Sequence, residues 1–180
     1  MALRLYTSNA SPFCLKIMVL LHELKMTRQV ALDYSVKAFP TFQSTAHSHL
    51  APLGKIPALA VQVDSEEVPR VLFGSQVIAQ YLDSLARDKA LPAAGLERFE
   101  ALATESLADG ICEAALSLRY ERLERASSHF ARQIVLPAEL LWADWVSGQL
   151  SKITRAIPLL SKKATQIDPL SETLPLAGVG

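Results

Sequence analysis

The spacing of apolar residues changes once along this chain, and the change predicts two domains. Up to residue 85, short β-rich segments are interleaved with two helical patterns. From Leu96 onward, the chain contains two long helical patterns with apolar residues three or four positions apart, and no strand pattern. The sequence therefore predicts an α/β domain over residues 1–85, a linker over 86–95 and an all-helical domain over 96–180.

The order of elements in the first region is typical of a thioredoxin-like domain. We expect one parallel βαβ unit, then a long loop, then an antiparallel ββα unit. The predicted strands are 3–6, 30–34, 56–63 and 68–73, and the predicted helices are 13–24 and 75–85. In the second region we expect one helix over 96–118 and another over 141–157, interrupted near Pro158.

Composition excludes several classes of function. Lys plus Arg and Asp plus Glu both number 18, so the chain lacks the basic excess of a nucleic-acid-binding protein or a polybasic membrane anchor. There is no apolar run of about 18 residues, so no transmembrane helix is expected. The N-terminus does not resemble a signal peptide, and two cysteines, Cys14 and Cys112, favour a reducing cytoplasm. The four histidines show no metal-binding spacing, so no metal site is expected.

Three segments of the first region together resemble glutathione transferases. Residues 5–13 (LYTSNASPF) resemble the first strand and catalytic loop of that family, and 51–59 (APLGKIPAL) resemble its loop leading to a cis-proline. Residues 72–82 (LFGSQVIAQYL) resemble the segment that holds the glutamyl end of glutathione. Each segment alone is a weak signal, but their order and spacing within one small domain are specific. Segments 108–111, 119–121 and 149–153 resemble the helical domain of a bacterial branch.

The resemblance implies an enzyme that conjugates the glutathione thiolate to a small apolar electrophile. It implies glutathione as co-substrate, no metal, a homodimer, and neither a nucleic-acid nor a membrane partner. A non-catalytic binding or regulatory member of the family is the alternative. A thiol-disulfide reductase is disfavoured, because Ser11-Pro12-Phe13-Cys14 lacks the first cysteine of a CxxC motif.

The expected chemistry needs glutathione as a thiolate, and Ser11 is the first candidate to stabilise it. A free cysteine thiol has a pKa of about 8.5, and one charge-assisted hydrogen bond of roughly 1.5–3 kcal/mol lowers that value by about one to two units. By resemblance Ser11 matches the catalytic serine or cysteine of the family, whereas its position before Pro12 also suits a plain helix N-cap. Ser8 is the alternative donor, and Cys14 is expected to pack in the first helical turn.

The resemblance assigns the remaining glutathione contacts to two further segments. Ile56 would pair its main chain with the cysteinyl part of glutathione ahead of a cis bond to Pro57, and Lys55 would meet the glycyl carboxylate. Ser75 would bind the glutamyl carboxylate at a helix N-terminus. Gly74 departs from the family, which has an acid here for the glutamyl ammonium, and this predicts weak glutathione binding.

Several further expectations concern the second region and Gly74. Glycine at residue 74 is also explained if the backbone there has a positive φ. Asp109, from a partner subunit, is a possible replacement for the missing acid, and a solvated aspartate is an equally good explanation of it. Leu107, Ile111 and Ala115 are candidate walls of a second-substrate site between the domains, although a core stripe has the same spacing. Residues 170–180 resemble the start of the family's buried central helix, so the helical domain is expected to be truncated.

Overall fold

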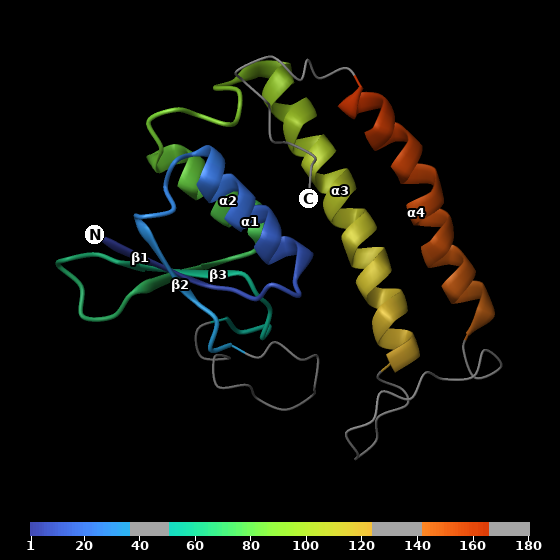
Figure 1. Cartoon of the computed structure of the whole chain (residues 1–180), viewed down its shortest axis with the longest axis horizontal. Coiled ribbons are helices and arrows are strands. Elements are labelled where there is room, and N and C mark those ends of the chain that lie inside the picture. Colours follow the sequence, from blue (N-terminus) through green and yellow to red (C-terminus); the bar gives the residue numbers. More distant parts are fainter. Residues whose placement is uncertain (37–50, 124–141, 166–180) are drawn as a thin grey trace. The chain divides into compact units, whose positions relative to one another are not determined.

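The structure is a computed structural model that describes residues 1–36, 51–123 and 142–165 (Figure 1). The chain divides into two compact units. The first ends at Leu102 and the second begins at Ala103, inside a long helix. The predicted boundaries at residues 85 and 96 stay a prediction.

The first unit contains a four-stranded mixed sheet and two helices in the predicted order. The sheet order is β2-β1-β3-β4, in which β1 is parallel to β2 while β3 is antiparallel to both β1 and β4. This arrangement confirms the thioredoxin-like α/β fold. The elements are β1 (Ala2–Tyr6), α1 (Pro12–Glu23), β2 (Val30–Asp33), β3 (Ala58–Gln62), β4 (Arg70–Phe73) and α2 (Ser75–Leu85).

The core of this unit lies between the sheet and its two helices. Alternation along β1 buries Leu3 and Leu5, and the antiparallel register places Val61 and Leu59 beside them. Both helices contribute one apolar face to the same cluster, with Ile17, Leu20 and Leu21 from α1 and Ile78 and Leu82 from α2. The periodicities of the two element types thus converge on one core.

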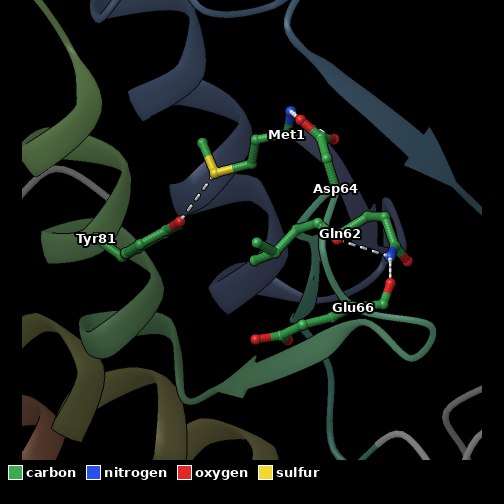
Figure 2. A network of polar contacts seen from close by, with 6 residues as sticks. Met1, Gln62, Asp64, Glu66 and Tyr81 are labelled. Atoms are coloured by element: carbon green, nitrogen blue, oxygen red, sulfur yellow. Dashed lines mark hydrogen bonds and ion pairs between the residues drawn. The ribbon is translucent and has the colours of Figure 1, made fainter.

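The β3–β4 hairpin is held by polar contacts at the sheet edge where β3 ends. The Gln62 side-chain amide donates to the backbone carbonyls of Val63 and Glu66, at 3.2 and 2.6 Å. Figure 2 shows Gln62 beside Glu66. The Asp64 carboxylate accepts from the Met1 ammonium at 3.1 Å. An ion pair between Glu66 and Arg70 lowers the pKa of the glutamate and raises that of the arginine. The three segments that resemble glutathione transferases meet at the opposite edge of the sheet.

The helical region contains α3 (Gly95–Leu123) and α4 (Ala143–Ala164), as the long apolar repeats predict. The predicted interruption near Pro158 is wrong, because α4 continues through that residue to Ala164. Proline removes the hydrogen bond to the carbonyl of Thr154, but that residue is exposed, so the loss of the donor is tolerable. The predicted start of a central helix at 170–180 lies outside the described residues. In the described part of the chain, no helix has the length and apolar content needed to span a bilayer.

Leu59→Ala should lower the free energy of unfolding by about 2–5 kcal/mol, because Leu59 is fully buried in the central strand and its loss leaves a cavity. Leu32→Ala is the matched control, since Leu32 is 41% exposed on β2 and its truncation should cost about 0.5 kcal/mol or less. Chemical denaturation of both variants measures the difference. Equal losses would show that the core is not centred on β3.

Candidate functional site

At one edge of the sheet, β1, β2 and β4 end and β3 begins, with the four terminal residues in register. Tyr6 pairs with Asp33 on one side and with Ala58 on the other, and Ala58 pairs in turn with Phe73. The loop holding residues 7–11 follows β1, residues 55–57 precede β3, and residues 74–75 follow β4. The structure therefore brings the three motif segments to the same edge, although about 60 residues of sequence separate the first from the last.

A small apolar cluster packs next to this edge of the sheet. Cys14 is fully buried, as expected for a packed first-turn residue, and it contacts Val36 and Ile56, with Tyr6 packed against the group. These four residues come from α1, the segment after β2, the segment before β3 and the end of β1. The cluster thus fixes the start of α1 relative to the loop that carries Ile56.

Ser11 is the N-cap of α1. Its Oγ accepts a hydrogen bond from the Cys14 backbone N–H at 3.4 Å, and its φ of −99° and ψ of 121° are the extended values of an N-cap. Ser8 Oγ accepts from the backbone N–H of Ala10 at 3.3 Å. Across the residues that the structure describes, both hydroxyls act only as acceptors, so each keeps its proton for a ligand. An N-cap serine and a thiolate donor are therefore compatible roles.

The segment before β3 has the expected backbone. The Ile56–Pro57 bond is cis, which confirms the prediction made from the sequence. Both residues are buried, whereas Lys55 is exposed. Gly54 has a φ of 62° and donates its N–H to the Ala51 carbonyl at 2.8 Å, which forms the turn that leads into Lys55.

Gly74 and Ser75 form the N-terminus of α2. Gly74 is the N-cap with a φ of 87°, a conformation that residues with a side chain rarely adopt, so the backbone itself explains glycine here. Ser75 is 8% exposed, and its hydroxyl makes no hydrogen bond within the described ranges. The first turn of α2 contains no acidic residue. This helix end therefore offers backbone N–H groups and a buried hydroxyl, which together suit an anion.

Asp33, the last residue of β2, is a half-buried carboxylate that sequence reasoning missed. Its Oδ1 accepts from the hydroxyl and the backbone N–H of Ser35, at 2.5 and 2.9 Å, and Arg4 approaches Oδ2 at 3.4 Å. These hydrogen bonds, the Ser35 hydroxyl first, lower the pKa of Asp33. Asp-x-Ser is a turn signal that the sequence did contain. The turn directs the chain from β2 to Val36 in the apolar cluster.

The second-substrate candidates belong to the second unit. Leu107 and Ile111 are half-buried on α3 and Ala115 is exposed, four residues apart along the helix as their spacing predicts. Asp109 lies on the same helix and is also half-buried. The residues that the structure gathers at the sheet edge are Ser8, Ser11, Ile56, Pro57, Gly74 and Ser75, all in the first unit.

Known proteins share both this fold and this sequence pattern. The family model for the glutathione S-transferase N-terminal domain matches residues 10–85. A glutathione transferase family member from Pseudomonas fluorescens Pf-5, solved with bound glutathione, is 34% identical with a TM-score of 0.75, and the match covers 98% of this chain and 80% of that one. A glutathione S-transferase from Methylobacillus flagellatus, also solved with glutathione, is 25% identical with a TM-score of 0.75 and coverages of 98% and 77%. Among curated proteins, no match was found.

The sheet topology and the helical region define a thioredoxin-like protein with an appended helical region. The identity to the Pseudomonas protein over most of both chains is decisive, and this chain belongs to the glutathione transferase family. A β-etherase from Sphingobium shares the fold at 19% identity, with a TM-score of 0.67 and coverages of 98% and 79%.

Asp33 should make the stability of the fold depend on acid. A carboxylate with a lowered folded pKa stabilises the fold above its ordinary pKa of 3.8, and this contribution is lost as the pH falls through the lower folded value. Asp33→Asn should therefore be less stable than wild type at neutral pH, and the difference should shrink below about pH 4. Melting temperatures across this range measure the effect. The exposed carboxylate of Asp88 provides the control Asp88→Asn, and a pH-independent gap for Asp33→Asn would contradict the assignment.

Proposed function

We propose that this protein binds glutathione at the sheet edge described above and transfers its thiolate to a small apolar electrophile. The observation that carries the proposal is the convergence of Ser11, Ile56 and Ser75 at one edge, where the family's glutathione-binding segments are expected. The Pseudomonas relative, 34% identical, was solved with glutathione and, in a second structure, with S-(propanoic acid)-glutathione. A bound conjugate in a relative supports transfer as well as binding.

The thiol of glutathione would lie at the N-terminus of α1. Ser11 Oγ accepts from Cys14 N–H and has its own proton available for the sulfur, and the first-turn N–H groups carry the positive end of the helix dipole. Both effects favour the thiolate, which is the nucleophile. In the transfer step, the thiolate forms a bond to the electrophilic carbon, and the electron pair of the broken bond leaves with the leaving group or moves onto the acceptor. Ser8 is the alternative hydrogen-bond donor.

The peptide part of glutathione would run along residues 55–57 toward α2. Ile56 lies two positions before Ala58, the first paired residue of β3, so an extended ligand would continue the sheet. Ser75 and the free N–H groups of α2 suit the glutamyl carboxylate, because a buried hydroxyl without a partner is costly until a ligand satisfies it. The exposed Lys55 suits the glycyl carboxylate.

The electrophile would contact Leu107, Ile111 and Ala115 on α3. We further propose a cytoplasmic homodimer, as in the family. The alternative function is a non-catalytic binding or regulatory protein, and the missing acid at Gly74 is the observation that favours it. Glutathione affinity and conjugation of a model aryl halide, measured on the same protein, separate the two functions.

Ser11→Ala should raise the pKa of bound glutathione by about one to two units and barely change its affinity, because one hydrogen bond to the thiolate is lost. The ultraviolet absorbance of the thiolate as a function of pH measures this pKa, and calorimetry measures the affinity. Ser8→Ala is the matched control and should leave the thiolate pKa unchanged. If Ser8→Ala alone shifts the pKa, the donor is Ser8; if neither does, backbone N–H groups hold the thiolate.

Gly74→Glu separates the two explanations of this glycine when it is compared with Gly74→Ala. Both variants should lose roughly 1–3 kcal/mol of stability, because the φ of 87° is strained for any side chain. The glutamate should also meet the glutamyl ammonium, so Gly74→Glu should bind glutathione about tenfold more tightly than Gly74→Ala. Calorimetric titration and thermal melts measure both quantities. Equal affinities of the two variants, or tight binding by the wild type, would show that the ammonium has another partner.

A further inference from the structure

The N-terminus of α2 holds a buried hydroxyl that no group in the described part of the chain satisfies. Ser75 is the first residue of this helix and is 8% exposed, and its hydroxyl makes no hydrogen bond within the described ranges. The first N–H groups of a helix also lack intrahelical partners, and they carry the positive end of its dipole. Because an unsatisfied buried hydroxyl is costly, this helix end suits a negatively charged ligand that accepts hydrogen bonds.

The four strands and the helices α1 and α2 place no acidic side chain beside this anion site. The three segments that meet at this edge of the sheet contain neither Asp nor Glu. Asp33 lies on β2, and β1 and β3 separate it from β4 by about 14 Å, at about 4.8 Å per strand. Glu23 is the last residue of α1, and Asp83 is in the last turn of α2. Each of these carboxylates is therefore remote from the start of α2.

Glutathione carries an ammonium on the same carbon as its glutamyl carboxylate, so both charges would enter this site together. The helix end and Ser75 favour the carboxylate. The ammonium meets the positive end of the same dipole, where a cation is unfavourable, and these elements offer no carboxylate to compensate. From the usual energy of a charge at a helix end, the ammonium should weaken binding by about two- to five-fold.

The surroundings of Gly74 are open and apolar. Among the described residues, a β-carbon on Gly74 would meet only Val77 Cγ2, at 3.9 Å, which is an ordinary van der Waals distance. Val77 is 52% exposed, and Phe73, which precedes the glycine, is 50% exposed. An uncharged group beside the ligand carboxylate therefore has room here and contacts apolar surface, whereas an ammonium gains no partner from it.

We propose that this site recognises the glutamyl carboxylate without the ammonium, so that its co-substrates include glutathione-like thiols whose amino group is absent or acylated. The chemical class is a thiol peptide that ends in a carboxylate with no positive charge next to it. This inference rests on the proposed function, because it names what the glutathione site at α2 reads. All the residues that carry it lie in the first unit.

Two analogues of glutathione, each lacking one of the two charged groups, test the inference on the full chain. Glutaryl-cysteinyl-glycine keeps the carboxylate and lacks the ammonium, whereas 4-aminobutyryl-cysteinyl-glycine keeps the ammonium and lacks the carboxylate. All ligands are S-methylated, so that thiol ionisation does not contribute. The glutaryl analogue should bind as tightly as S-methylglutathione or up to about five-fold more tightly, and the aminobutyryl analogue at least about ten-fold more weakly. Calorimetric titration measures the three Kd values.

Gly74→Glu and Gly74→Ala are the matched variants, because both place a side chain at a φ of 87° and only one adds a carboxylate. Gly74→Glu should reverse the preference and bind S-methylglutathione about ten-fold more tightly than the glutaryl analogue. Gly74→Ala should keep the wild-type order of the three ligands. If Gly74→Glu does not fold, the wild-type series decides alone.

The outcomes separate this inference from the proposed function. A wild-type preference for S-methylglutathione over the glutaryl analogue of more than about two-fold would overturn the inference, because an acid from elsewhere then meets the ammonium, and the proposed function would stand. Equal affinities for the glutaryl and aminobutyryl analogues would also overturn it, because the helix end then does not read the carboxylate. Failure of all three ligands to bind would overturn the proposed function, and this inference with it.

Discussion

The pairing of β3 between β1 and β4 is the constraint on which the rest of this structure depends. Tyr6, Ala58 and Phe73 occupy one row of the ladder, so the residues that follow β1, precede β3 and follow β4 must meet at one edge. A slip of one residue would turn Leu59 and Val61 out of the core and would also separate the three segments. Burial of the core and assembly of the site are therefore specified by the same hydrogen-bond register.

The sequence was sufficient for this part of the fold because its signals are local. Alternation in β1, helical spacing in α1 and α2, and a proline flanked by a turn each act within about ten residues. The same local character explains the error at Pro158. A proline disfavours a helix interior, but the exposure of Thr154, which makes the lost hydrogen bond tolerable, depends on the surroundings of α4.

The particular backbone and side-chain groups that a polar side chain binds could not be predicted in this way. Lys89 and Asp83 occur in an ordinary polar stretch, and nothing in their spacing indicates that together they bind five backbone groups at the end of α2. Arg98 is similar, since its partner Gln80 lies 18 residues away. The contacts of Asp33 were predictable only in part. Its turn with Ser35 is a local motif, whereas the approach of Arg4 requires the pairing of β1 with β2.

Gly74 shows how backbone geometry and ligand chemistry compete for one position. The chain must turn from β4 into α2 with a φ of 87°, and glycine meets this requirement without strain. An acidic side chain there would add a partner for an ammonium, but only with the strain of an unfavourable φ. The N-terminus of α2 still provides its dipole, its free N–H groups and the buried hydroxyl of Ser75, which all favour the carboxylate of the same ligand. The proposed site would therefore keep a contact for the glutamyl carboxylate, because that contact depends on the helix itself and not on the residue at 74.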